Sequence, residues 1–121
     1  MKRSRIFAAA ALAACLLIAM IPAARAGRVG GPEYRFGVVP AATSVYYDIP
    51  FAAGEMAVVT VNGDAPALLY VLLYDADGHV ANGVGTMESK TVSMDIYRSG
   101  TFRVEVRNMG LRDAAFRLTT N

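Results

Sequence analysis

A strict alternation of apolar and polar side chains near the C-terminus is the feature that most constrains what this chain can fold into. Three apolar residues alternate there with four polar ones, in the run Thr101, Phe102, Arg103, Val104, Glu105, Val106 and Arg107. A period of two places the apolar side chains on one face of a strand and the polar side chains on the other. Turn residues at Asn108-Met109-Gly110 end this strand, and a second strand follows that buries Phe116 and Leu118. The chain therefore ends in two half-buried strands.

The same kind of pattern recurs along the chain at short spacing. The predicted strands are Tyr34–Val39, Thr43–Ile49, Glu55–Asn62, Ala67–Tyr74, His79–Val84, Lys90–Tyr97, Thr101–Arg107 and Ala114–Thr120. The connections hold turn-forming residues such as Asn62-Gly63-Asp64 and Asn82-Gly83. No window after residue 26 combines a helical period with helix caps. About eight short strands with polar turns predict an all-β fold, an antiparallel two-sheet β-sandwich.

Four phrases, in this order and spacing, resemble the bacterial pre-peptidase C-terminal (PPC) domain family. They are Tyr46–Glu55, Val58–Asp64, Leu72–Gly78 and the stretch that begins at Ser99 and ends in Phe116-Arg117-Leu118. The resemblance implies a small, jelly-roll-like β-sandwich from a secreted protein. We expect this domain to span residues 43–121, with residues 27–42 as a lead-in that includes a first strand. Such domains usually accompany a peptidase catalytic domain, for which the chain has no room.

The front of the chain has the layout of a secretory signal peptide. Lys2, Arg3 and Arg5 precede an apolar run over Ile6–Ile21, and Ala24-Arg25-Ala26 offers small residues for cleavage before Gly27. The run is shorter than the roughly 18–20 apolar residues that span a bilayer comfortably. We therefore predict a signal peptide over residues 1–26, no membrane span after its removal, and a periplasmic or secreted domain.

A lipoprotein reading of the same segment is the alternative. Leu12-Ala13-Ala14-Cys15 looks like a lipidation box, which would leave the protein lipid-anchored through Cys15. The apolar tract Leu16–Ile21 that follows argues against it, because mature lipoproteins usually continue with a polar linker. The remaining 95 residues contain no cysteine and so no disulfide.

Cleavage also changes the charge balance. Four of the twelve basic residues lie in the leader, which leaves eight against ten acidic ones and a net charge of −2. The arginines are scattered singly, so the sequence shows no electrostatic footprint for nucleic acid.

The sequence does not favour catalysis. Ser-His-Asp chemistry needs a histidine within hydrogen-bond reach of a nucleophile and held by a carboxylate. After the leader, the sole histidine is His79, and no serine lies in a nucleophile-elbow motif; the serines are Ser44, Ser89, Ser93 and Ser99. We expect His79 to be an exposed residue at the start of a strand, and the chain to have no catalytic residues, no cofactor and no enzymatic activity.

The sequence also gives little support for a metal site at Asp75-Ala76-Asp77-Gly78. A calcium loop of the EF type needs a third oxygen ligand before its glycine and a later glutamate, and both are missing. Aspartate and glycine are sufficiently explained by a tight turn. PPC domains often carry alternating aspartates just before this turn, where this chain has Leu68 and Tyr70. We therefore predict no metal ligands.

That departure produces the one candidate interaction surface. If Leu69, Val71 and Leu73 face the core, an outward row of two leucines and two tyrosines remains: Leu68, Tyr70, Leu72 and Tyr74. Tyr70 is then the expected anchor for a partner or for a homodimer. Alternatively, the segment Glu33–Val39 or a loop covers the row.

The sequence thus favours a non-catalytic secreted or periplasmic module that interacts with an envelope or extracellular protein or polysaccharide. A calcium-dependent adhesion-like or carbohydrate-binding module is the alternative, and a calcium titration of the melting temperature separates the two.

Overall fold

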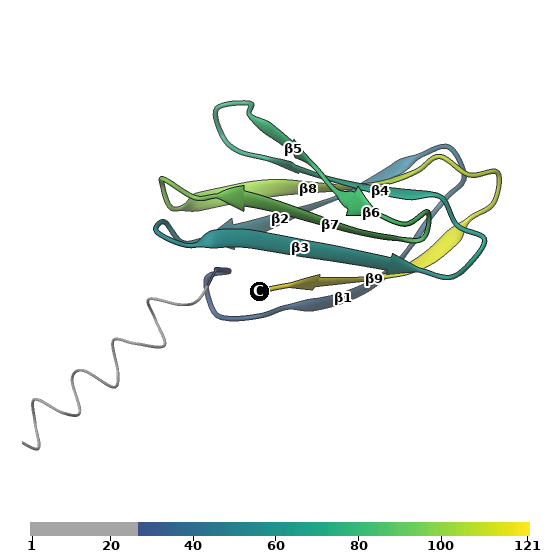
Figure 1. Ribbon diagram of the computed structural model, residues 1–121, viewed down its shortest axis with the longest axis horizontal. Helices are drawn as coiled ribbons and strands as arrows, with labels where there is room; N and C mark the ends of the chain where they lie inside the picture. The colour runs from purple at the N-terminus through teal and green to yellow at the C-terminus, as the bar shows by residue number, and fades with distance from the viewer. Residues whose placement is uncertain (1–26) are drawn as a thin grey trace, which may run out of the picture.

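The computed structural model describes residues 27–121, so the predicted leader and Cys15 lie outside the described residues. The described residues form nine strands. None of them belongs to a helix long and apolar enough to cross a membrane. Every strand pair is antiparallel, and the strands run along the long axis of the molecule (Figure 1).

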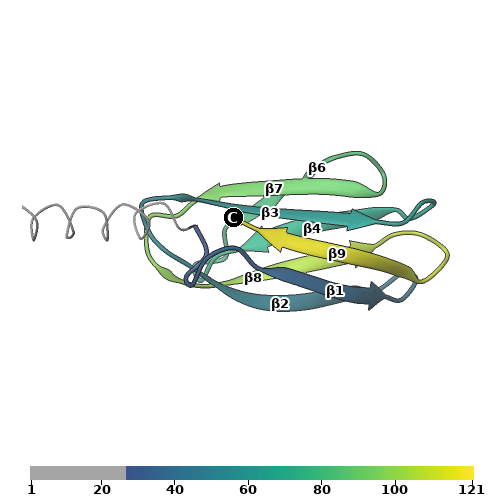
Figure 2. The same ribbon diagram turned by 90° about the horizontal axis from the view of Figure 1, so that it is seen from below.

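The strands divide into two sheets, whose layers are seen edge-on in Figure 2. The five-stranded sheet has the order β1 (Tyr34–Val39), β9 (Ala114–Thr120), β3 (Met56–Gly63), β7 (Ser89–Asp95) and β6 (Val84–Gly85). The four-stranded sheet has the order β2 (Ser44–Phe51), β8 (Gly100–Asn108), β4 (Leu69–Tyr74) and β5 (Val80–Asn82). This arrangement confirms the predicted antiparallel two-sheet β-sandwich.

The core lies between the two sheets and follows the predicted alternation. Phe102, Val104 and Val106 of β8 are buried, as are Leu69, Val71 and Leu73 of β4. Two aromatic contacts join strands within this core. The rings of Phe51 and Phe102 meet edge to face at 5.8 Å between centroids, and those of Tyr47 and Phe116 at 6.3 Å. Such pairs add to the stabilisation that burial of their area provides.

One predicted strand is split in two. The stretch His79–Val84 forms β5 in one sheet and β6 in the other, with Gly83 at the crossing. The amide of Gly83 donates to the carbonyl oxygen of Val71, and a Cβ atom on Gly83 would lie 2.4 Å from Cγ1 of Val71. Only glycine lets the backbone approach β4 this closely, so the chain changes sheets here and the strand count rises to nine.

We call the two ends of the sandwich the loop end and the terminal end. The loop end is formed by the segments 64–68, 86–88 and 109–113, which connect strands at the right of Figure 1. The terminal end holds Gly27, the turn 75–79, the loop 96–99 and the C-terminal Asn121. The first described residues meet the C-terminal residue there, because the amide of Arg28 donates to the carbonyl oxygen of Asn121 at 3.2 Å.

Candidate functional site

In the structure, the four residues of the predicted row of leucines and tyrosines lie in different surroundings. Leu68 lies before β4 at the loop end, where its carbonyl oxygen accepts the amide of Met109 at 3.0 Å. Tyr70 is 40% exposed, Leu72 and Tyr74 are half-buried, and all three point outward from the four-stranded sheet. That these residues form an interaction surface stays a prediction.

One of the two covers suggested for this row, the segment Glu33–Val39, is wrong. The segment Glu33–Val39 does not lie over it, because Tyr34–Val39 forms β1 at the edge of the other sheet, paired along its length with β9. Polar side chains from the neighbouring strand β8 lie beside the row instead, since Leu72 is opposite Glu105 and Tyr70 is opposite Arg107.

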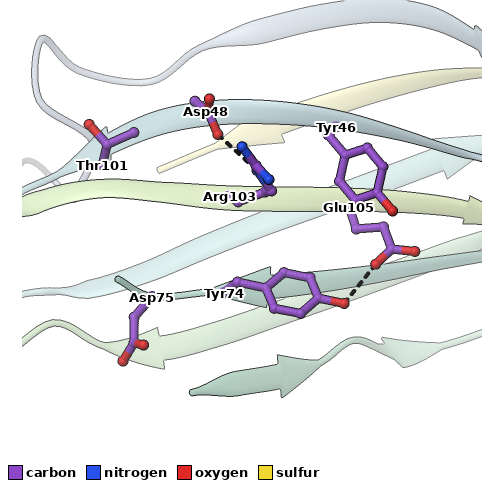
Figure 3. Close-up of a pocket in the computed structure, with 7 residues that line it drawn as sticks. All are labelled: Tyr46, Asp48, Tyr74, Asp75, Thr101, Arg103 and Glu105. Carbon is purple, nitrogen blue, oxygen red and sulfur yellow. Dashed lines mark hydrogen bonds and ion pairs between the residues drawn. The ribbon is translucent and has the colours of Figure 1, made fainter. Parts of the chain in front are cut away.

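Glu105 is the centre of a polar cluster on this outward face (Figure 3). It is only 3% exposed, although the alternation along β8 places it on the solvent side. Its carboxylate accepts hydrogen bonds from Ser44 Oγ at 2.6 Å, Tyr74 OH at 2.7 Å and Arg107 Nε at 2.8 Å. These partners come from β2, β4 and β8, so a single buried charge joins three adjacent strands.

The electrostatics of this cluster favour an ionised Glu105. Burial acts to raise the pKa of its carboxyl, but hydrogen bonds from Arg107, Ser44 and Tyr74 outweigh it and lower that pKa to about 2. The hydrogen bond to Glu105 raises the pKa of the Tyr74 phenol, and the same carboxylate raises the pKa of the Arg107 guanidinium. The cluster is therefore a fixed ion pair and no proton donor at neutral pH.

A second buried charge lies near the loop end. Lys90 of β7 is 8% exposed, and its ammonium group donates to the carbonyl oxygens of Leu69, at 2.8 Å, and of Thr86. The same nitrogen lies 4.6 Å from the centroid of the Tyr70 ring. Carbonyl oxygens and an aromatic face thus solvate this cation in place of water.

The Asp75–His79 segment at the terminal end has the hydrogen bonds of a tight turn. Oδ1 of Asp75 accepts the amides of Asp77 and His79 at 2.9 and 2.8 Å, and Oδ2 lies 2.7 Å from Nδ1 of His79. These hydrogen bonds lower the pKa of Asp75 despite the opposing effect of its desolvation. Ligand atoms of Asp75, Asp77 and His79 lie within 4.8 Å of one another. The hydrogen bonds of Asp75 explain that proximity without a metal.

The residues considered for catalysis do not come together. His79 is exposed and is hydrogen-bonded to Asp75, as a residue next to the turn. Within residues 27–121, no hydrogen bond joins His79 to a serine; Ser44 donates to Glu105, and Ser99 accepts the amide of Ala53 at 2.7 Å. The Ser-His arrangement that catalysis of this kind needs is therefore not assembled in the described residues.

The loop end presents three large apolar side chains that are exposed to solvent. Leu111 is 98% exposed, and Met109 and Met87 are each 56% exposed. They surround a cleft of about 700 Å³ whose lining also includes Pro66 and Leu68. Exposed apolar groups that gather around a concave surface are typical of a binding site.

Buried hydrogen bonds hold this surface in place. Asn108, which is 1% exposed, donates to the carbonyl oxygens of Val39 and Arg112 at 3.0 and 2.7 Å. Its Oδ1 accepts the amide of Gly110 at 2.8 Å. The amide of Leu69 also donates to the carbonyl oxygen of Met87 at 2.9 Å. The three loops are therefore tied to one another.

Sequence reasoning missed Glu105, Lys90, Asn108 and the loop end. Each of the three polar side chains has at least one hydrogen-bond partner far away in the chain, so no local spacing predicts that it is buried. One signal was present, because Met109 is an apolar residue in the predicted turn and the apolar Leu111 follows that turn.

Comparison by sequence finds no matching family model and no significantly similar curated protein. Comparison of structures finds the same fold in several proteins. The pre-peptidase C-terminal domain of collagenase from Bacillus anthracis is 13% identical, with a TM-score of 0.62 over 74% of this chain and 88% of that one. This confirms the resemblance to the PPC family at the level of the fold.

Two further similar structures are both called PliG, a periplasmic lysozyme inhibitor of g-type lysozyme. The protein from Aeromonas hydrophila is 12% identical, with a TM-score of 0.56 over 74% of this chain and 84% of that one. The protein from Salmonella Typhimurium is 11% identical, with a TM-score of 0.52 over 74% and 89%. At these identities the likeness concerns the fold alone.

Proposed function

We propose that this domain is a non-catalytic module that works outside the cytoplasm and binds a protein partner through its loop end. The observation that carries the proposal is the cleft bordered by Met87, Met109 and Leu111, three large apolar side chains held in water by a rigid set of loops. Exposing such groups is unfavourable in a free monomer, and a partner that covers them gains their burial.

The chemistry of the loop end fits a protein better than a small polar ligand. Large apolar side chains line the cleft together with the charged Asp64, Arg112 and Asp113. Protein–protein interfaces also combine large apolar side chains with polar and charged ones. Because Asn108 fixes the loops beforehand, little ordering entropy would be lost on binding.

Two other observations support the proposal. The loop end lies at the other end of the sandwich from the start of the described chain, which is drawn in dark blue (Figure 1). Two of the proteins with the same fold are described as inhibitors of another protein, a g-type lysozyme. The predicted signal peptide supports a location outside the cytoplasm.

Site-specific photo-crosslinking in cells that produce the full chain tests this function. A photo-reactive amino acid at position 111 should give a discrete protein adduct, and Met109→Asp should abolish it. The matched control places the same amino acid at position 97, an exposed tyrosine of the terminal end. Equal adducts from both positions, or none from position 111, would contradict the proposal.

A further inference from the structure

A second, chemically different depression lies on the outward face of the four-stranded sheet. It has a volume of about 600 Å³ and is flanked by Tyr46 of β2 and Tyr74 of β4, with Arg103 and Glu105 of β8 between them (Figure 3). Tyr46 is directly opposite Glu105, and Tyr74 is directly opposite Arg103. The two rings thus stand on strands separated by two strand spacings, about 10 Å across the sheet.

The depression is fixed before any ligand arrives. The hydroxyl of Tyr74 donates to Glu105, whose other partners, Ser44 and Arg107, hold the carboxylate in place. Tyr46 is 57% exposed, and the guanidinium carbon of Arg103 lies 5.9 Å from its ring centroid. The site therefore offers two separate aromatic groups around a rigid polar centre.

The remaining polar groups can exchange their present hydrogen bonds for hydrogen bonds to a ligand. Arg103 and Asp48 share one ion pair of 3.2 Å, and both side chains are about 60% exposed. Such a pair contributes little and can yield its hydrogen bonds to another partner. Thr101 adds a hydroxyl at the edge of the depression. A ligand would thus find donors, acceptors and aromatic surface in one place.

The charges select against an ionic ligand. The lining includes the carboxylates of Asp48, Asp75 and Glu105, which oppose an anion. These carboxylates are already partnered by Arg103, His79 and Arg107, so a cation would have to displace a partner. A neutral molecule with many hydroxyl groups meets neither penalty.

We infer that the depression binds a neutral saccharide, whose apolar ring faces lie on Tyr46 and Tyr74 while its hydroxyls exchange hydrogen bonds with Arg103 and Asp48. A volume of about 600 Å³ lies within the range of roughly 300–1,000 Å³ that is usual for small-ligand sites. This saccharide site is separate from the loop end, so the two proposals stand or fall independently.

The test is a titration of the mature domain, followed by NMR amide shifts, with neutral tetrasaccharides of glucose, xylose and N-acetylglucosamine. At least one should shift the amides of Tyr46, Tyr74 and Arg103 in a saturable way. Tyr46→Ala should weaken that binding at least tenfold. The matched control is Tyr34→Ala, an exposed tyrosine on the other sheet, which should leave it unchanged.

Each outcome decides the proposal. Saturable shifts that cluster around the depression and depend on Tyr46 support it. Absence of binding to every neutral tetrasaccharide overturns it, and so does binding that Tyr34→Ala weakens as much as Tyr46→Ala. A response restricted to a charged probe, such as a galacturonate oligosaccharide, would also overturn it.

Discussion

The two ends of this sandwich differ in the buried groups beneath their loops. Beneath the terminal end, Phe51 and Phe102 pack edge to face within the core. At the loop end, the buried amide of Asn108 holds the loops through hydrogen bonds. Loops of the terminal end have hydrogen bonds too, but a side chain that makes one of them, Ser99, is exposed. A hydrogen bond away from water is stronger than one open to it, and the end with the buried amide is also the one that presents its apolar side chains around a cleft.

The largest expected effect tests the packed end. Phe102→Ala should lower the free energy of unfolding by about 3–5 kcal/mol, because it leaves a cavity beside Phe51. Urea unfolding measures this loss. Phe36→Ala, an exposed phenylalanine of β1, is the control and should change stability by less than about 1 kcal/mol. Equal losses would show that the core does not depend on this aromatic contact.

The next effect tests the hydrogen-bonded end. Asn108→Ala should cost about 2–3 kcal/mol, because the carbonyl oxygen of Val39 and the amide of Gly110 lose their partner. Asn82→Ala, an exposed asparagine of β5, serves as the matched control in the same unfolding experiment. If the two substitutions cost the same, Asn108 does not hold the loops.

A third prediction compares the buried charge of Glu105, which joins three strands, with the uncharged side chain of Asn108. Its pKa in the folded state is lowered to about 2, so the stability it contributes is complete above its ordinary pKa of about 4.3 and disappears as the pH falls toward 2. Glu105→Gln should therefore cost about 2 kcal/mol at pH 6 and clearly less at pH 2.5. A cost that is the same at both pH values would mean that the charge of Glu105 does not matter.

The smallest effect is expected at the tip of the loop end. Leu111→Ser should change the free energy of unfolding by less than about 0.5 kcal/mol, because this side chain is 98% exposed. Thermal unfolding and urea unfolding both measure this. A loss as large as that of Asn108→Ala would place Leu111 in the packing of the domain rather than on a binding surface.

A feature of this molecule could be predicted from the sequence where the residues that determine it lie close together in the chain. The alternation around Phe102, Val104 and Val106 predicts strand β8 and its buried face, because a period of two is a property of the strand itself. The same holds for Leu69, Val71 and Leu73 in β4. The two-sheet fold followed from these local patterns and from the turns between them.

The polar contacts were not predictable in this way. Ser44 and Glu105 are 61 residues apart, and Val39 and Asn108 are 69 apart, so these pairs exist only once the strand order is known. The alternation along β8 even predicts that Glu105 is exposed to solvent, because it indicates only the face of the strand on which a side chain lies. It does not indicate whether neighbouring side chains cover that side chain. The split at Gly83 was missed for the same reason, since it depends on the approach to Val71.

Native-state amide hydrogen exchange tests the central claim most directly, namely that the loop end is a preformed rigid surface. The amides of Leu69 and Met109 donate to carbonyl oxygens of other loops, whereas those of Asp77 and Gly78 donate to Asp75 within the exposed turn at the terminal end. We predict that the two loop-end amides exchange at least about 100-fold more slowly than the two turn amides, since their release requires the loops to separate. Equal exchange rates at Leu69, Met109 and Asp77 would contradict the account, because the apolar surface would then form only when a partner binds.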